Sequence, residues 1–250
     1  MAVSIAAGVA TGADIFRKVF TRLAVAIAIG ATALFLVFPE IDVLAAKAFY
    51  LGDGRFSGKQ AQGVAFLRWF FICLYFSCIG LAIAGIMFSR ARRRHWMGLA
   101  LGQWLFMAAC LGAGPGLVAN VILKDQWGRA RPTQTVEFGG YKTFTTALVP
   151  ARQCHRNCSF VSGEASSIFV LFFAAALIIP QWSISLAAAG TVGGLVAGLV
   201  RMSQGAHFLS DVIFAGVFMA LTVLAVHKLM LGYLPAVSRN GTSIQPSPSL

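Results

Sequence analysis

The stretch Phe160–Val200 reads FVSGEASSIFVLFFAAALIIPQWSISLAAAGTVGGLVAGLV and contains a single charged residue, Glu164. It holds two apolar blocks, Phe160–Ile179 and Ser183–Val200, each near the ~20 residues that a helix needs to cross a bilayer. A soluble domain would carry about 25% charged residues, whereas this chain carries 11% and is 58% hydrophobic. The stretch therefore predicts membrane-spanning helices.

Similar apolar blocks recur along the chain, which predicts an all-α polytopic membrane protein with six transmembrane helices. The other four blocks are Leu23–Phe38, Val64–Phe88, Trp96–Leu123 and Val212–Leu231. Residues 1–234 form one membrane domain, and the polar residues 235–250 are expected to be a disordered cytoplasmic tail. Residues 1–12 are apolar, but no Lys or Arg precedes them, so an amphipathic or disordered lead-in is favoured over a secretory signal.

Basic residues near the span ends indicate the orientation. With six spans both termini lie on one side, together with the loop SRARRRH, which holds Arg90, Arg92, Arg93 and Arg94. Only nine of the 20 basic residues fall on that side, but short loops close to span ends carry the positive-inside signal. We therefore expect the termini and this loop in the cytoplasm. The mixed segment Phe38–Gly58 is interpreted as an interfacial helix on the outer side.

Two basic segments lie on the outer side, Lys124–Ser159 and the turn that begins at Arg201. A charge run of this kind is most often a solvated rim. The order of the spans, however, brings the end of the third, the start of the fourth, the end of the fifth and the start of the sixth to the same membrane face. The polar groups at all four places should therefore meet at an interfacial site.

The residue types at this face suit phosphate chemistry. Three of them are cations, and the planar fork of arginine matches phosphate oxygens. Ser162 and Gly163 open a helix, where free N–H groups and the helix dipole favour an anion. His207 and Asp211 lie four residues apart, on one helix face. Asp211 would hold one ring nitrogen as N–H, which leaves the other free to attack phosphorus. The three cations are Lys124, Arg131 and Arg201.

These residues resemble the three-part signature of the type 2 phosphatidic acid phosphatase superfamily. Its Lys-x6-Arg-Pro motif is similar to KDQWGRARP at 124–132, and its Arg-x5-His-x3-Asp motif to RMSQGAHFLSD at 201–211. Its Pro-Ser-Gly-His motif corresponds to VSGE at 161–164. The resemblance implies that His207 is the nucleophile, that Asp211 orients it, and that the phosphate is bound by Lys124, Arg131, Ser162, Gly163 and Arg201.

Glu164 stands where the resemblance implies a histidine that protonates the leaving oxygen. Three interpretations follow for this residue. It can be the general acid, if burial outweighs the neighbouring cations that favour its carboxylate form. It can be a charge partner or headgroup contact, if the leaving group is a good one. The third interpretation is a degenerate site that binds phosphate without turnover.

The outer loop raises two further questions. Cys154 and Cys158 bracket three residues and are expected to form a disulfide on an oxidising face; free thiols, or a metal site with His155, are the alternatives. Basic residues outside the motifs could line an entrance for an anionic headgroup, or could equally form a rim that contacts lipid phosphates. These residues are Arg129, Arg152, His155 and Arg156.

The sequence thus predicts a phosphatase of the bacterial inner membrane with its site facing the periplasm. It would hydrolyse a lipid phosphate through a phosphohistidine, with no metal, other cofactor or nucleic acid involved. Lipid A phosphate, polyprenyl diphosphate and phosphatidylglycerol phosphate are the substrates considered, in that order. A lipid phosphotransferase that uses the same histidine is the first alternative. A non-enzymatic transporter or channel is the second, although charges are rare inside the spans. The sequence does not define the oligomeric state.

Overall fold

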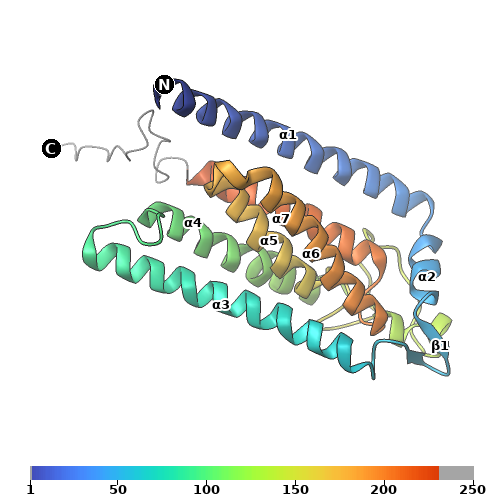
Figure 1. The fold of residues 1–250 in the computed structure, drawn as a ribbon. Helices are drawn as coiled ribbons and strands as arrows, with labels where there is room; N and C mark the ends of the chain where they lie inside the picture. The colour runs from blue at the N-terminus through green and yellow to red at the C-terminus, as the bar shows by residue number, and fades with distance from the viewer. Residues whose placement is uncertain (1, 231–250) are drawn as a thin grey trace.

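Long helices packed side by side form the molecule, which is described by a computed structural model for residues 2–230, with side chains from Gly12 onward. The site end of the bundle carries a short helix and a small hairpin (Figure 1). The elements are α1 Ala2–Val37, α2 Glu40–Lys47, β1 Tyr50–Gly52, β2 Arg55–Phe56, α3 Gln62–Arg92, α4 Leu101–Leu111, the π-helix η1 Gly112–Lys124, the 3₁₀ turns η2 Pro132–Gln134 and η3 Val136–Phe138, α5 Gly163–Ile178, the 3₁₀ turn η4 Pro180–Trp182, α6 Ser183–Ser203 and α7 Leu209–Leu229.

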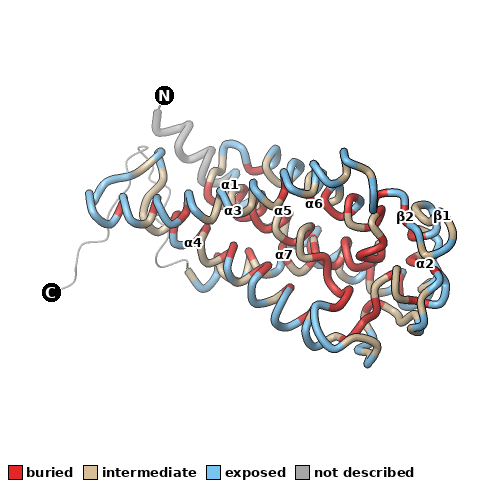
Figure 2. The backbone as a smooth tube through the Cα atoms, turned by 90° about the horizontal axis from the view of Figure 1, so that it is seen from below, coloured by how far each residue is buried: buried red, intermediate tan, exposed pale blue. Residues whose placement is uncertain are grey.

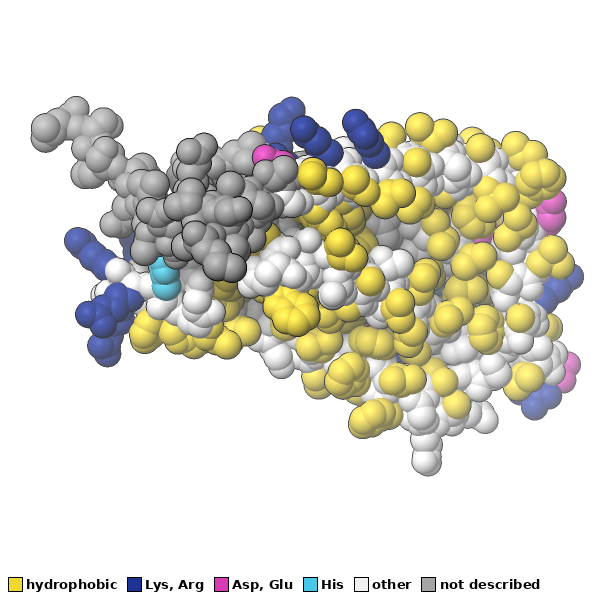
Figure 3. Space-filling view, turned by 45° about the horizontal axis from the view of Figure 1, so that its top comes forward, with side chains coloured by type: hydrophobic (Ala, Val, Ile, Leu, Met, Phe, Trp, Pro, Cys, Tyr) yellow, Lys and Arg dark blue, Asp and Glu magenta, His cyan; other side chains and the backbone are white. Residues whose placement is uncertain are grey.

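The flank of the bundle is apolar, as expected for a surface in contact with lipid. Hydrophobic side chains are spread along the length of the bundle on the face seen in Figure 3, and large ones such as Phe66 and Trp69 are 72% and 63% exposed. A soluble protein seldom exposes continuous apolar surface on this scale. The all-α membrane architecture predicted from the sequence is confirmed.

The count of six spans is not confirmed. Within the described residues, five helices are long and apolar enough to cross a membrane: Gly12–Val37, Gln62–Arg92, Leu101–Lys124, Pro180–Ser203 and Leu209–Leu229. The expected span Phe160–Ile179 is realised as α5, which has only 16 residues. Its first expected residues, Phe160–Ser162, belong instead to a buried loop that leads into the site.

One other segment differs from expectation. The segment Phe38–Gly58 is not one interfacial helix: α2 ends at Lys47, and an antiparallel hairpin of β1 and β2 follows. The hairpin turns through Gly52 and Gly54, whose φ angles of 90° and 70° are of the kind that glycine adopts readily. The lead-in 1–12 is helical from Ala2, and the expected disordered tail 235–250 lies outside the described residues.

The third span is irregular near its middle, where α4 continues into η1. Pro115 lies inside η1 and has no N–H to donate, so the regular α-helical hydrogen-bond ladder cannot pass through it. Gly112, Gly114 and Gly116 surround the proline and lower the cost of the altered backbone. The irregular helix ends at Lys124, which points this residue toward the start of α5.

Helices α5 and α7 form the interior of the bundle, as the run of buried residues along them shows (Figure 2). Small residues on α6 let it approach α5 closely, as is common between membrane helices. Gly194 faces the ring of Phe169, and Gly190 faces Phe172 and Phe173. This contact holds the start of α5 beside the end of α6, and so brings Ser162 near Arg201.

We expect the substitution Gly194→Ala to destabilise the bundle. A Cβ at this position would lie 2.6 Å from atoms of the Phe169 ring, and overpacking of this kind costs about 1–3 kcal/mol. The midpoint of thermal unfolding in detergent should therefore fall. Gly80→Ala on α3 is the matched control, because a Cβ there has no atom within 4 Å. A midpoint for Gly194→Ala at or above that of the wild type would contradict this packing.

Candidate active site

The polar residues singled out from the sequence lie at one end of the bundle, opposite the turn between α3 and α4 (Figure 1). Lys124 ends η1, Ser162 precedes α5, Arg201 lies in the last turn of α6, and Asp211 lies in the first turn of α7. His207 occupies the short connection between α6 and α7. The helix directions therefore bring together residues that are far apart in the sequence.

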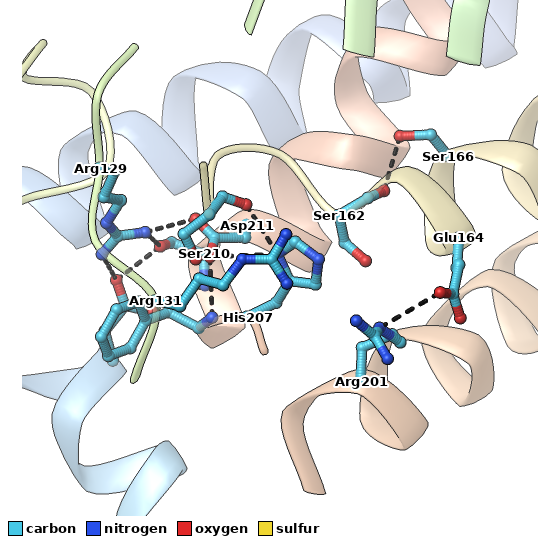
Figure 4. Close-up of polar contacts among 12 residues, drawn as sticks. Arg129, Arg131, Ser162, Glu164, Ser166, Arg201, His207, Ser210 and Asp211 are labelled. Carbon is cyan, nitrogen blue, oxygen red and sulfur yellow. Dashed lines mark hydrogen bonds and ion pairs between the residues drawn. The ribbon is translucent and has the colours of Figure 1, made fainter. Parts of the chain in front are cut away.

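A cradle for an anion forms around the start of α5. The Ser162 hydroxyl has no exposed surface and no hydrogen-bond partner within the described part of the chain. A serine in this position usually caps its own helix, but this one makes no side-chain cap. In Figure 4 it points into the space between His207, Arg131 and Arg201. A buried hydroxyl without a partner is costly, so this one is suited to bind a ligand oxygen.

Gly163 lets a cation approach the same helix start. A Cβ at residue 163 would lie 2.8 Å from the Lys124 Nζ atom, so a larger residue would displace the ammonium group. The first N–H groups of α5 have no acceptor within the helix. An anion placed here would therefore meet backbone donors, the positive end of the helix dipole and the lysine together.

Two arginines form the remaining sides of the cradle. Arg131 donates through Nη2 to the Asn157 carbonyl at 2.8 Å and to Asn157 Oδ1 at 3.0 Å, which fixes its guanidinium. Arg201 Nη1 donates to Gln204 Oε1, and its Nε atom is buried without a hydrogen bond. Both arginines thus keep donor capacity for an incoming ligand.

His207 is buried, with 2% of its surface exposed. Its Nδ1 atom lies 2.7 Å from the Ser159 carbonyl oxygen, which can only accept, so the proton is assigned to Nδ1 and Nε2 is the free nitrogen. Burial lowers the pKa of His207 to about 3, and the nearby cations Lys124 and Arg131 act in the same direction. The imidazole is therefore neutral near pH 7, and its Nε2 atom keeps a free lone pair.

The contact between His207 and Asp211 differs from the expected one. Their closest atoms, Nδ1 and Oδ2, are 3.7 Å apart, and the Ser159 carbonyl takes the hydrogen bond that Asp211 was expected to accept. Asp211 Oδ2 instead accepts from the Ser159 hydroxyl at 2.5 Å and from the Phe208 N–H at 2.8 Å. Asp211 therefore holds the imidazole indirectly, by fixing the backbone on both sides of it.

Arg129 is not a rim or entrance residue, because its side chain is completely buried. Its Nη1 atom donates to Asp211 Oδ1 at 2.5 Å, and its Nη2 atom donates to Asp42 Oδ2 at 2.7 Å. The Phe208 ring covers it, with the Arg129 Cζ atom 4.5 Å from the ring centroid. By contrast, Arg152, His155 and Arg156 are exposed on the loop.

Glu164 pairs with two arginines, one of which the sequence reasoning missed. Arg68, on α3, places its Nε atom 3.0 and 3.3 Å from the two Glu164 carboxylate oxygens. Arg201 Nε lies 3.4 Å from Glu164 Oε1. Glu164 thus forms ion pairs with arginines from two different helices, α3 and α6. A basic residue in the first turns of an apolar span was the signal that could have identified Arg68.

The loop before the cradle is cross-linked. Cys154 and Cys158 form a disulfide, with their Cα atoms 5.7 Å apart. The Cys158 N–H donates to the Lys124 carbonyl at 3.0 Å, and the Ser159 N–H donates to the Arg129 carbonyl at 2.9 Å. Within the described residues, no group of three or more His, Cys, Asp or Glu side chains is placed to hold a metal ion.

A cleft of about 380 Å³ runs from the cradle along the flank of the bundle, between α3 and η1. Its polar end is formed by Lys124, Gly163 and Glu164. The apolar part is lined by Phe71, Ile72, Phe76, Ile79, Pro115 and Gly116. One cleft thus joins a polar end, which holds Lys124 and Glu164, to an apolar part, and this combination suits an amphiphilic ligand.

A neutral buried imidazole beside an anion cradle, in a bundle with an apolar flank, is what a membrane-bound phosphoryl-transfer enzyme requires. The model of the PAP2 superfamily matches residues 102–233, and the chain belongs to this superfamily. Like the relatives described next, it is a membrane-bound phosphatase.

The relatives found by sequence comparison carry phosphatase names. The chain is 38% identical to a lipid A 4'-phosphatase of Francisella tularensis subsp. novicida, over 78% of this chain and 89% of the relative. It is 33% identical to a lipid A 4'-phosphatase of Rhizobium leguminosarum, over 77% and 88%. A lipid A 1-phosphatase of Rhizobium etli is 33% identical over 50% of each chain. No solved structure matches significantly.

Proposed function

We propose that this protein removes a phosphate group from lipid A through a phosphohistidine formed at His207. The observation that carries the proposal is the unpartnered Ser162 hydroxyl, which faces the same space as His207, Arg131 and Arg201. The names of the similar proteins support lipid A as substrate and favour its 4'-phosphate. The apolar cleft supports a substrate with long hydrocarbon chains, because contact between its apolar walls and water would be costly in free energy.

The chemistry proceeds in two displacements. His207 Nε2 attacks phosphorus, the bond from phosphorus to the sugar oxygen breaks, and that oxygen takes up a proton. Water then attacks the phosphohistidine, which releases inorganic phosphate and restores the imidazole. Lys124, Arg131 and Arg201 stabilise the charge on the three equatorial oxygens, together with the Ser162 hydroxyl and the first N–H groups of α5.

We place the active site on the periplasmic side of the inner membrane. Residues 90–94, which contain four arginines, lie at the opposite end of the bundle from the site, and such loops favour the cytoplasm. The disulfide lies at the site end, where an oxidising compartment would preserve it. Lipid A phosphate would then reach the site from the outer leaflet, with its chains in the bilayer.

The central test is phosphate release from purified lipid A by the wild type and by His207→Ala. Release should be lost in the variant, and label that is stable to base but lost in acid should show phosphate on histidine only in the wild type. Continued release by His207→Ala would overturn the proposal. Assays with and without an added acceptor lipid separate a phosphatase from a phosphotransferase, because only the latter needs the acceptor to turn over.

Glu164 is proposed to be the proton donor to the leaving oxygen, because its carboxyl group lies beside Arg201 in the cradle. Arg68 and Arg201 pair with this carboxyl group, and a bound phosphate would draw Arg201 to its own oxygens. The proton arrives with the phosphate monoanion and passes through Glu164 to the leaving sugar oxygen.

We expect Glu164→Gln to lower kcat by about 10²- to 10⁴-fold on lipid A, because the sugar oxygen is a poor leaving group without a proton. The loss should be small on p-nitrophenyl phosphate, whose leaving group needs no proton, and Glu164→His should retain activity on both. Arg68→Gln is the control, because it removes the ion pair but keeps the carboxyl group. Equal losses on the two substrates would contradict the donor role.

Filling the cleft should impair lipid binding without touching the chemistry. A Cβ on Gly116 meets no atom within 4 Å, so Gly116→Leu would project into the cleft and displace part of a bound chain. Excluding about two methylenes, at about 0.8 kcal/mol each, should raise KM for lipid A about tenfold. The KM for p-nitrophenyl phosphate should stay constant. Gly112→Leu is the matched control, since Gly112 is equally open and lies outside the cleft lining.

A further inference from the structure

A second polar cluster lies behind the imidazole, on the side away from the anion cradle. It consists of Asp42, Arg129, Ser210 and Asp211, and all four side chains are buried, with at most 1% exposed. Asp42 comes from α2, outside residues 102–233 that match the family model. The motif residues alone do not explain why this helix supplies a buried carboxylate to the site end of the bundle.

Asp42 is held entirely by donors. Its Oδ2 atom accepts from Arg129 Nη2 at 2.7 Å and from the Ser210 hydroxyl at 2.5 Å, and its Oδ1 atom accepts from the Ser210 N–H at 2.7 Å. Burial raises the pKa of Asp42, while Arg129 opposes that change. Because every polar neighbour donates to it, the geometry is that of an ionised carboxylate.

The contacts form a continuous path from Asp42 to the imidazole nitrogen Nδ1, on the side of the ring away from the attacking Nε2 atom. Asp42 binds Arg129, and Arg129 binds Asp211 at 2.5 Å. Asp211 binds the Ser159 hydroxyl at 2.5 Å, and the Ser159 carbonyl lies 2.7 Å from His207 Nδ1. The groups in this path are buried away from water. Hydrogen bonds that involve a charged group are strong in such an environment.

The net charge of this cluster also bears on the proposed reaction. Two carboxylates surround one guanidinium, so Asp42, Arg129 and Asp211 together carry one net negative charge. When phosphorus bonds to Nε2 while Nδ1 keeps its proton, the ring becomes positively charged. The negative cluster opposes the cations on the other side of the ring and stabilises this developing charge.

We infer that Asp42 is a positioning residue for His207, acting through Arg129 and Asp211 and keeping the cluster negative during phosphohistidine formation. This inference rests on the proposed function, since it takes His207 as the nucleophile. It assigns to α2 a part in the reaction: the helix carries the carboxylate that completes the charge balance behind the imidazole.

The test compares Asp42→Asn with Glu40→Gln, an exposed residue of the same helix. Asp42→Asn keeps the shape of the side chain but removes its charge. We expect kcat on p-nitrophenyl phosphate and lipid A to fall on the order of 10-fold, as for other carboxylates one layer behind a reacting group. KM should be unchanged, because the cradle is intact, and labelling of His207 should slow in parallel. Glu40→Gln should match the wild type.

Ser210→Ala provides the second variant, which keeps the test decisive if Asp42→Asn does not fold. It removes the hydroxyl that bridges Arg129 and Asp42 but keeps both charges, so kcat should fall less and KM should again be constant. Wild-type kcat in a folded Asp42→Asn, or a change confined to KM, would overturn the inference.

His207→Ala is assayed alongside: if it still releases phosphate, the proposed function fails and this inference fails with it. If only His207→Ala is impaired, the inference alone fails.

Discussion

One guanidinium group with no exposed surface, that of Arg129, sets the arrangement of the site end of this protein. It lies between the Asp42 and Asp211 carboxylates, and its Nε atom donates to the Thr145 carbonyl at 2.9 Å. Removing one partner of such a buried pair costs about 3–5 kcal/mol, because the other charge stays buried. Helix α2, the outer loop and α7 must therefore stay together.

The two sides of His207 differ in how fully their polar groups are hydrogen-bonded. Behind the ring, donors and acceptors match closely, so nothing there is available to a ligand. In front of it, the Ser162 hydroxyl has no hydrogen-bond partner among residues 12–230, and Arg201 Nε has only the 3.4 Å ion pair with Glu164. A saturated network is rigid, whereas unpartnered buried groups gain free energy when a ligand satisfies them. The difference in hydrogen bonding alone therefore distinguishes the side that supports the imidazole from the side proposed to bind the ligand, without any comparison with relatives.

Sequence reasoning placed the cradle residues and Asp211 at one end of the bundle, but it missed Asp42 and the burial of Arg129. Lys124, Ser162, Arg201 and His207 could be brought together because span order alone assigns helix ends to a membrane face. Arg129 was interpreted as a rim or entrance residue, since a loop rich in basic residues gives no sign of which one is buried. A charged residue is almost never fully buried without a partner, and its partner Asp42 lies 87 residues away in a segment interpreted as interfacial.

The departure from six full spans has a chemical consequence. An α-helix of 16 residues is about 24 Å long, less than the ~30 Å hydrocarbon core. Helix α5 therefore begins inside the protein, and Ser159, Phe160, Val161 and Ser162 before it have no exposed surface. The start of α5, where we propose that phosphate binds, is therefore in a dry environment, and burial also lowers the pKa of the adjacent His207.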